Sequence, residues 1–286
     1  KKIFQQAYPN FKNKILIQKD LANTLKIIAS KGKKGFYEGE IAEKISSEMK
    51  KNDGLISKSD LKKYNPVWRE PLISDYKDTK IITMGPPSSG GLHVIQMLNI
   101  LDNFNLKKIK HNSSEYINLL AETMKYAYAD RSKYLGDPDF YNVPIKKVTS
   151  KKYANEISNN IEIGKAASVE DIFPGKFIEN ESHETTHFSV VDKNGNVVSM
   201  TYTLNSTFGS KVVIKGTGIL MNNEMDDFSA APGIPNQFNL LGAEANQIAP
   251  YKRPLSSMTP TIVLKNNELF FTTGKSGGAR IISAGL

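Results

Sequence analysis

The stretch of sequence that decides the fold is TTHFSVVDKNGNVVSMTYTL, residues 185–204. Two β-prone segments flank a polar turn, and the Asn-Gly dipeptide at 194–195 is a favoured two-residue hairpin loop. With such a loop, the pairing runs back to Thr186 opposite Thr203. The pattern therefore predicts a β-hairpin in which Thr203 lies within one strand position of Thr185.

Upstream of this hairpin the sequence is mainly helical. Residues 18–49 repeat apolar side chains at helix spacing, interrupted by a glycine turn, and so predict two short helices. Residues 92–106 and 115–134 predict two longer helices, the second ended by Gly and Pro. Residues 72–84 alternate as strands do. Helices followed by strands indicate a layered α/β or α+β fold, with the change of character near residue 184.

Composition and charge narrow the possible functions. The 286 residues, 39% of them hydrophobic, suffice for one large domain. There is no cysteine for disulfides, thiolate nucleophiles or zinc–thiolate sites. The net charge is +9, but only four of the 38 basic residues are Arg and the lysines are scattered, which is typical of a solvated surface. We therefore expect no nucleic-acid partner, and the isolated histidines predict no metal.

Both ends of the chain look cut. It begins at Lys1 rather than Met, and it ends in an apolar segment, residues 281–286. We therefore expect a piece of a longer protein, truncated at both ends. No apolar run reaches the roughly 20 residues of a membrane span, and any signal peptide would lie upstream of Lys1.

The hairpin threonines suggest a nucleophile. A threonine hydroxyl reacts poorly unless a base takes its proton, and the α-amine of an N-terminal threonine, freed by chain cleavage, can be that base. Such an amine has a reference pKa of about 7.7–8.0, which suits proton transfer near neutral pH. Thr185 could act in this way, although paired threonines also simply suit a strand. His187 is an alternative base for Thr185 or Ser189, but we interpret it as a structural strand residue.

Three later clusters could bind and polarise a substrate. Glu224 and Asp227 offer carboxylates for an ammonium group, although acidic loop residues are usually only solvated. The adjacent hydroxyls of Ser256 and Ser257, with backbone N–H groups nearby, suit a carboxylate. The glycine pair 277–278 can turn two backbone amides toward one point, as an oxyanion hole requires, although Gly-Gly often marks an ordinary turn.

Together these segments resemble the γ-glutamyltranspeptidases, members of the N-terminal-nucleophile hydrolase superfamily. Residues 185–192 look like the start of that family's small subunit, and 222–228 and 253–258 look like its later motifs in matching order and spacing. The upstream segments that resemble its large subunit are 35–39, 86–91 and 129–138. The resemblance covers nearly the whole chain and implies an α+β fold, a four-layer αββα sandwich of the N-terminal-nucleophile hydrolase type.

The resemblance also implies a role for each matching residue. Thr185 is the nucleophile, freed by self-cleavage of the bond between Glu184 and Thr185, and Thr203 orients it. Residues 1–184 are then part of the large subunit and 185–286 part of the small subunit, together one αββα domain. The α-amino group of the donor is then held by Asn205, Glu224 and Asp227, and its α-carboxylate is held by Ser256 and Ser257. The backbone amides of Gly277 and Gly278 form the oxyanion hole. Phe238 belongs to a lid, Ala230 to Leu240, that covers the bound group.

Two features depart from the family pattern. Lys275-Ser276 stands where the family usually has Ser-Pro before the glycine pair. The family also supplies an arginine for the donor carboxylate from a segment before Lys1, so no residue of this chain is assigned to that role.

The activity implied is γ-glutamyl transfer from glutathione or another γ-glutamyl compound to water or to an acceptor amino acid or peptide. No cofactor is expected, and the implied location is periplasmic or extracellular. Two alternatives remain open. One is another enzyme of the superfamily, such as a poly-γ-glutamate depolymerase or a different amidase, and the lid argues against a polymer. The other is a non-catalytic binding protein that retains the fold.

Overall fold

The computed structural model describes residues 16–168, 172, 185–231, 234–237, 239–278 and 280–286. The chain forms two compact units. The first takes in the residues up to Trp68 together with Phe208–Asn223, and the second contains Arg69–Thr207 and Glu224–Leu286. Because each unit has its own buried core, each is described by itself.

In its described residues, the first unit consists of four helices and a short hairpin. They are α2 (Lys19–Lys31), α3 (Lys33–Tyr37), α4 (Gly39–Lys51), α5 (Lys58–Lys63), and β5 (Val213–Ile214) paired with β6 (Ile219–Leu220). The apolar face of α4, including Ile41 and Ile45, packs with Leu61 and Ile214 to form the core. The sequence predicted two helices before residue 50, and the structure adds α3, which follows α2 through Gly32 at a φ of 57°.

The second unit is organised around an antiparallel sheet with the strand order β1-β2-β7-β8. Its strands are β1 (Leu72–Tyr76), β2 (Thr79–Thr83), β7 (Thr261–Lys265) and β8 (Glu268–Thr273). Strands β2 and β7 come from distant parts of the sequence, and the hydroxyls of Thr83 and Thr261, 178 positions apart, lie within 2.9 Å. The sheet therefore joins segments from both sides of residue 184.

Helices pack on one side of this sheet. The helices are α6 (Gly90–Leu101), α7 (Ser114–Tyr134), α8 (Ile145–Val148), α9 (Lys151–Ser158) and α11 (Arg280–Ala284), and the 3₁₀ turns are η1 (Leu106–Lys108), η2 (Glu224–Asp227) and η3 (Glu244–Asn246). Helix α6 contacts β1 and β2 and is covered in turn by α7, α9 and α11. Nearly every residue of α6 is buried, which agrees with its mostly apolar sequence.

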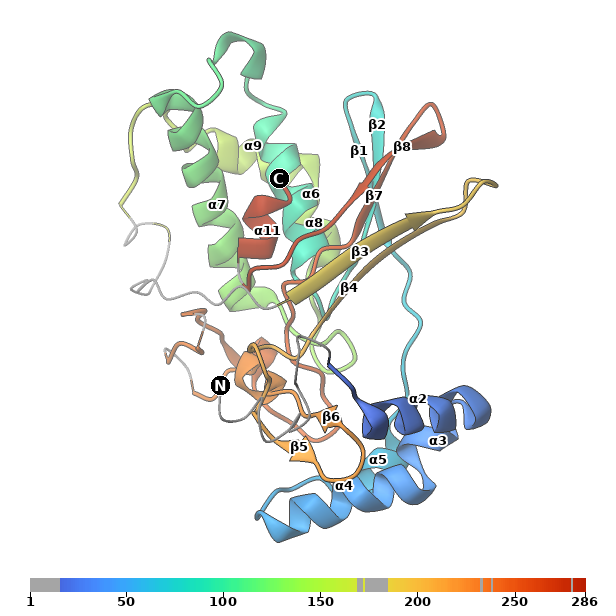
Figure 1. Ribbon diagram of the computed structural model, residues 1–286. Helices are drawn as coiled ribbons and strands as arrows, with labels where there is room; N and C mark the ends of the chain where they lie inside the picture. The colour runs from blue at the N-terminus through green and yellow to red at the C-terminus, as the bar shows by residue number, and fades with distance from the viewer. Residues whose placement is uncertain (1–15, 169–171, 173–184, 232–233, 238, 279) are drawn as a thin grey trace. The chain divides into compact units, whose positions relative to one another are not determined.

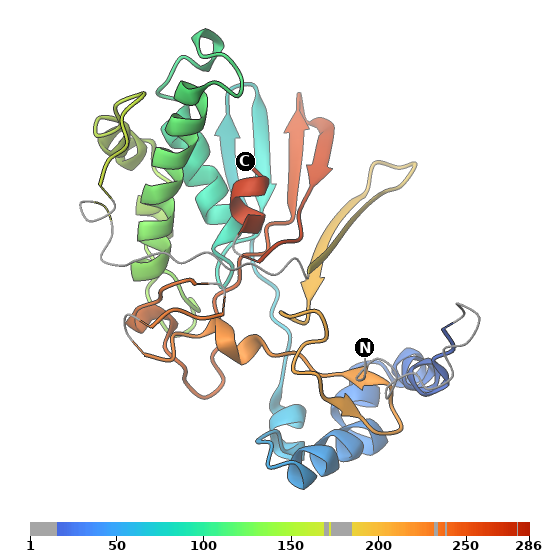
Figure 2. The same cartoon turned by 60° about the vertical axis from the view of Figure 1, so that its left-hand side comes forward.

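The predicted hairpin consists of β3 (Thr185–Val191) and β4 (Val197–Thr203). In Figures 1 and 2 it lies on the side of the sheet opposite to the helices. The hydroxyl of Ser199 donates to the carbonyl of Thr273 at 3.2 Å, which joins the hairpin to the end of β8. Helices, sheet and hairpin form successive layers, and the predicted α+β class is confirmed.

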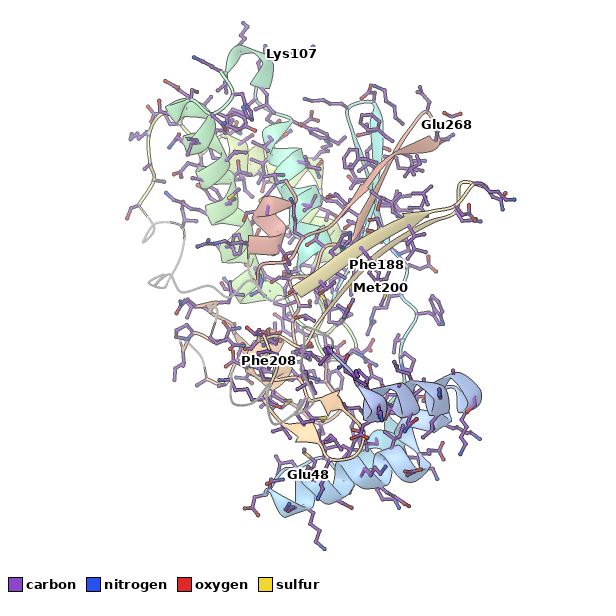
Figure 3. All side chains as sticks on the ribbon, viewed as in Figure 1. Glu48, Lys107, Phe188, Met200, Phe208 and Glu268 are labelled. Carbon is purple, nitrogen blue, oxygen red and sulfur yellow. The ribbon has the colours of Figure 1, made fainter. Side chains whose placement is uncertain are left out.

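The hairpin turns its polar face toward the sheet and its apolar face away from it. Phe188 pairs with Met200 across the two strands, and these side chains are 41% and 45% exposed. Figure 3 labels both side chains on the hairpin. Thr185 and His187 lie on the other face and are half-buried.

The hairpin register differs by one residue from the prediction. The sequence placed Thr186 opposite Thr203, whereas in the structure Thr185 pairs directly with Thr203. The looser expectation, that Thr203 lies within one strand position of Thr185, is confirmed.

The turn explains this shift. The N–H of Asp192 donates to the carbonyl of Asn196 at 3.0 Å, so the loop has three residues instead of two, with Gly195 at a φ of 82°. The Asp192 carboxylate accepts the N–H groups of Asn194 and Asn196 at 2.8 and 2.9 Å. This side chain stabilises the wider loop, and an Asn-Gly pattern alone does not reveal it.

Candidate active site

Thr185 and Thr203 lie side by side at one end of the hairpin, where β3 begins and β4 ends. Their hydroxyl oxygens are 3.4 Å apart, which is longer than an ordinary O–H···O hydrogen bond. The hydroxyl oxygen of Thr203 also accepts the backbone N–H of Asn205 at 2.9 Å. Thr203 is therefore held by its own strand end, with its hydroxyl beside that of Thr185.

Asn205 turns the chain away from β4. Its backbone has a φ of 75°, a left-handed conformation that Asn adopts more readily than most residues. The residue is 6% exposed, and its side chain hydrogen-bonds to Asp227. The turn thus brings an amide side chain to the carboxylate of η2.

The 3₁₀ turn η2 carries two crowded acidic side chains. Burial, and next the charge of Glu224, raise the pKa of Asp227 to about 7, while the charge of Arg131 and the hydrogen bond from Asn205 act to lower it. Burial also raises the pKa of Glu224. A nearby cation would favour the ionised form of both groups, so this side of the site suits an ammonium group.

Ser256 and Ser257 are held by the turn that precedes α6. The N–H of Ser256 donates to the carbonyl of Pro87 at 2.9 Å, and the N–H and hydroxyl of Ser89 both donate to the carbonyl of Ser256 at 2.8 Å. The close approach requires Gly90, because a Cβ there would lie 2.8 Å from the carbonyl oxygen of Ser257. The serine pair therefore has a fixed backbone.

A buried carboxylate holds the segment that leads to these serines. Asp137, 0% exposed, accepts the N–H of Arg253 at 2.8 Å. Its other oxygen accepts the N–H of Asp139 at 3.1 Å and a guanidinium N–H of Arg69 at 3.4 Å. Arg69 also binds Asp139 at 2.6 Å and holds the pKa of that carboxyl below its usual range. This network fixes the segment that precedes the serine pair. It does so from residues 137–139, which follow the end of α7 and lie more than a hundred positions earlier in the sequence.

These elements meet at a small pocket of about 30 Å³, with room for about one or two water molecules. Its polar and charged lining consists of Arg131, Thr185, Thr203, Asn205, Asp227, Ser256 and Ser257. The pocket brings the hydroxyl of Thr185 together with an acidic side, formed by Asp227, and a hydroxyl-rich side, formed by Ser256 and Ser257. Such a lining can hold the ammonium and carboxylate groups of an α-amino acid while a threonine hydroxyl attacks a carbonyl beyond them.

Sequence comparison identifies the family to which the chain belongs. A model of the family described as Gamma-glutamyltranspeptidase matches residues 2–286. The chain belongs to the γ-glutamyltranspeptidase family. It is 52% identical over 280 residues to the glutathione hydrolase proenzyme of Escherichia coli (strain K12), a match that covers 98% of this chain and 48% of that protein. The chain spans about half the length of the relatives it matches.

Solved structures agree with the assignment to the γ-glutamyltranspeptidase family. The Helicobacter pylori γ-glutamyltranspeptidase is 48% identical with a TM-score of 0.54, over 56% of this chain and 46% of that chain. The cephalosporin acylase from Bacillus halodurans is 26% identical with a TM-score of 0.75, over 96% of this chain and 47% of that chain. These likenesses confirm the predicted fold of the N-terminal-nucleophile hydrolase type.

The pocket contains most, but not all, of the residues that the resemblance to γ-glutamyltranspeptidases singled out. Gly278 lines it, whereas Gly277 and Glu224 do not, and both glycines have a positive φ, 133° at Gly277 and 53° at Gly278. Glu184 and Phe238 lie outside the described residues. Their predicted roles stay predictions, as do those of the two glycine amides.

Arg131, for which the sequence predicted no role, also lines the pocket. The sequence did single out the region around Arg131, since residues 129–131 resemble a large-subunit segment of the γ-glutamyltranspeptidases and fall within the predicted helix 115–134. An arginine on the buried side of a helix is uncommon, and burial became visible only in the structure.

His187 forms hydrogen bonds within the hairpin. Its Nδ1 lies 2.8 Å from the hydroxyl of Thr201, and its Nε2 lies 3.2 Å from that of Ser189. Among the described residues, no group of three or more His, Asp or Glu side chains converges to hold a metal ion. Within the same residues, no helix combines the length and apolarity needed to cross a bilayer.

Proposed function

We propose that the protein is a γ-glutamyltransferase and glutathione hydrolase that activates itself by cutting the bond between Glu184 and Thr185. The observation that carries this proposal is the direct pairing of Thr185 with Thr203 at a pocket that also presents Asp227 and the serine pair. Membership in the γ-glutamyltranspeptidase family and the name of the Escherichia coli relative, glutathione hydrolase proenzyme, support it.

Self-cleavage supplies the catalytic base. In the precursor, the hydroxyl of Thr185 attacks the carbonyl carbon of Glu184, the peptide C–N bond breaks, and water hydrolyses the resulting ester. The products are a new carboxylate on Glu184 and a free α-amine on Thr185. Residues 1–184 and 185–286 then belong to two subunits that share one domain, with strands of both in the sheet.

The mature enzyme transfers an acyl group in two steps. The α-amine of Thr185 takes the hydroxyl proton while the oxygen attacks the γ-carbonyl carbon of the donor, and the amides of Gly277 and Gly278 stabilise the oxyanion. The amine product leaves with that proton, and water or an acceptor amine then attacks the γ-glutamyl ester. Thr203 keeps the attacking hydroxyl in place throughout.

The two sides of the pocket fit the two charges of the glutamyl group. Its ammonium lies toward Asn205, Glu224 and Asp227, and its carboxylate lies toward Ser256 and Ser257. The lid from Ala230 to Leu240, with Phe238, closes over the bound group in this proposal, and Leu240 at its end already lines the pocket.

Intact-mass spectrometry of the full-length protein, followed by assay with a chromogenic γ-glutamyl anilide, tests this function. We expect the wild type to split into two fragments with Thr185 at the new N-terminus and to release the anilide. The Thr185→Ala variant stays whole and inactive, whereas Thr186→Ala, on the opposite face of β3, still splits. A folded wild type that stays whole would reject the self-activating nucleophile.

A second candidate is an amidase with a different acyl preference. The likeness to a cephalosporin acylase over 96% of the chain favours it as the runner-up. Glutaryl and γ-glutamyl anilides share the carbon chain and the terminal carboxylate, and they differ only in the α-amino group of the γ-glutamyl compound. A preference for the glutaryl anilide would support this candidate, because it needs no acidic side to the pocket.

The proposed location is periplasmic or extracellular. It follows from the resemblance to the γ-glutamyltranspeptidases, and cell fractionation with an antibody against the protein tests it. Recovery with the cytoplasmic fraction would contradict the proposal.

A further inference from the structure

Arg131 is a buried cation with no ion-pair partner among the described residues. It is 5% exposed on α7, and its neighbour Asp130 is 6% exposed. The Asp130 carboxylate is turned elsewhere and accepts hydrogen bonds from Gln96 at 2.6 Å and Tyr153 at 3.0 Å. A buried charge that lacks a directly paired opposite charge is unfavourable, so its presence at the pocket calls for a reason.

The guanidinium contacts Ser257 directly and is linked to Ser256 through Ser89. Its Nε donates to the hydroxyl of Ser89 at 3.0 Å, and Ser89 in turn donates to the carbonyl of Ser256 at 2.8 Å. Its Nη2 donates directly to the hydroxyl of Ser257 at 3.3 Å. One planar side chain from α7 thus contacts a segment 126 positions later in the sequence, across the proposed cleavage site.

These contacts set the direction of the Ser257 hydroxyl. A guanidinium has five N–H donors and no acceptor, so the Ser257 oxygen accepts from Arg131 and cannot donate to it. The hydroxyl hydrogen of Ser257 must therefore point away from Arg131. Because Ser257 lines the pocket, that hydrogen is available to an anion bound there.

The charges around Arg131 leave a positive potential on the serine side. Asp227 on η2 attracts the guanidinium from one side of the pocket, and Tyr128 lies near it on α7. His93 on α6 faces it too, but burial, together with the Arg131 charge, lowers its pKa to about 3, so His93 is neutral near pH 7. The negative charge that faces Arg131 therefore lies at η2, on Asp227. An anion bound at the serine pair would instead lie close to the buried guanidinium of Arg131.

We propose that Arg131 is a positioning residue for the anionic end of the substrate, which fixes the Ser257 hydroxyl as a donor and makes the serine pair select a carboxylate. The inference rests on the proposed function for the nature of that substrate, a γ-glutamyl compound. Arg131 acts through Ser257 and through its charge. It is therefore separate from the arginine that the resemblance places before Lys1, which would contact the carboxylate itself.

Binding measurements test this inference without requiring turnover. Calorimetry on the full-length protein compares L-glutamate with 4-aminobutyrate, which has the same amine and chain but no α-carboxylate. The variants are R131M, R131K and, as the matched control, K133M, which removes an exposed cation from the same helix. R131M is expected to weaken glutamate binding by about 10- to 100-fold, the range for a lost hydrogen bond to a charged group, and 4-aminobutyrate binding by less than about twofold.

R131K keeps the charge but not the two-pronged contact with Ser89 and Ser257, so a smaller, glutamate-specific loss of about fivefold is expected. K133M should bind both ligands as the wild type does. If R131M does not fold, as judged by its melting curve, R131K decides the question by the same comparison.

Equal losses for both ligands in the Arg131 variants would show a merely structural role and overturn the inference. An undiminished preference for glutamate in the variants, or a wild type that shows no preference, would also overturn it. Self-cleavage and anilide release are measured in parallel. A wild type that binds glutamate selectively but neither splits nor turns over would reject the proposed catalysis and leave the role of Arg131 standing.

Discussion

The first unit buries almost only apolar side chains, whereas the second buries many polar and charged ones. In the described part of the first unit, the buried polar residues are Thr24 and Thr217, and the hydroxyl of Thr24 donates to the carbonyl of Thr217 at 2.9 Å. Its ion pairs, such as Lys44 with Glu40, lie at the surface. This unit is therefore stabilised by the packing of amphipathic helices, with little contribution from charges.

In the second unit, buried polar groups position the pocket. Arg131 and Asp137 are nearly inaccessible to solvent, and each binds a segment on the far side of the proposed cleavage site, Ser257 and Arg253 respectively. Such groups contribute less to stability than apolar side chains of the same volume, but they fix the direction of donors and acceptors. The comparison shows that the pocket lies in the unit that buries most of the polar and charged side chains.

The largest expected effect is on the proposed nucleophile, Thr185, and its neighbour Thr203. Replacing Thr203 with Val keeps the shape of the side chain and removes the hydroxyl beside Thr185, so we expect self-cleavage and anilide turnover to slow by about a hundredfold. The matched control is Thr201→Val, on the same face of β4, which contacts His187 instead. Stopped-time mass spectrometry and steady-state kinetics measure both rates. Similar rates for Thr203→Val and wild type would remove Thr203 from the mechanism.

The next effect belongs to the first unit and concerns stability alone. Ile45 is 1% exposed in the core of that unit, and Ile45→Ala is expected to lower the free energy of unfolding by about 3 kcal/mol. The KM for the anilide should change by less than about twofold, because all pocket-lining residues belong to the second unit. Leu55→Ala, at a residue 95% exposed, is the control and should be neutral within about 0.5 kcal/mol. Urea titration and kinetics distinguish the outcomes.

The third prediction concerns the pH dependence of stability. The pKa of Asp227 is raised to about 7 in the folded protein, chiefly by burial, against about 3.9 in an unfolded chain. Between these values the folded state binds more protons, so the contribution of Asp227 to stability falls as the pH rises and is lowest above pH 7. Asp227→Asn should therefore be more stable than wild type at pH 8 and equally stable below about pH 4.

The same substitution should weaken glutamate binding, because it removes the anion that faces the ammonium group of the substrate in the proposed function. Melting curves from pH 4 to pH 8 provide the test, with Asp226→Asn at the exposed neighbour as the control. A pH-independent difference between Asp227→Asn and wild type would show that Asp227 does not titrate in this range.

The smallest effect lies at a helix start in the first unit. The hydroxyl of Ser57 accepts the N–H of Asp60 at 3.3 Å, and the Asp60 carboxylate accepts the N–H of Ser57 at 2.8 Å, which forms a capping box on α5. Ser57→Ala should cost about 1 kcal/mol of unfolding free energy, and Ser47→Ala, at an exposed position inside α4, should cost nothing. An equal response of the two variants to urea would mean that the cap does not stabilise this unit.

The sequence by itself determined the local features of this protein. Spacing and turn chemistry indicated the hairpin, the helices near α6 and α7, and the threonine that heads β3, because these depend on residues close together in the chain. The resemblance to the γ-glutamyltranspeptidases then placed Asn205, Asp227 and the serine pair at one site, and the pocket contains them.

Only the tertiary structure decided the register of Thr185 against Thr203, since a side chain, Asp192, widened the turn. It alone paired β2 with β7 and revealed Arg131 behind Ser257. The pairing of β2 with β7 and the contact of Arg131 with Ser257 join residues more than a hundred positions apart, so no periodicity or short motif encodes them. Whether an arginine on a helix is a solvated charge or a buried donor depends on what packs against that helix, and that is settled only when the chain is folded.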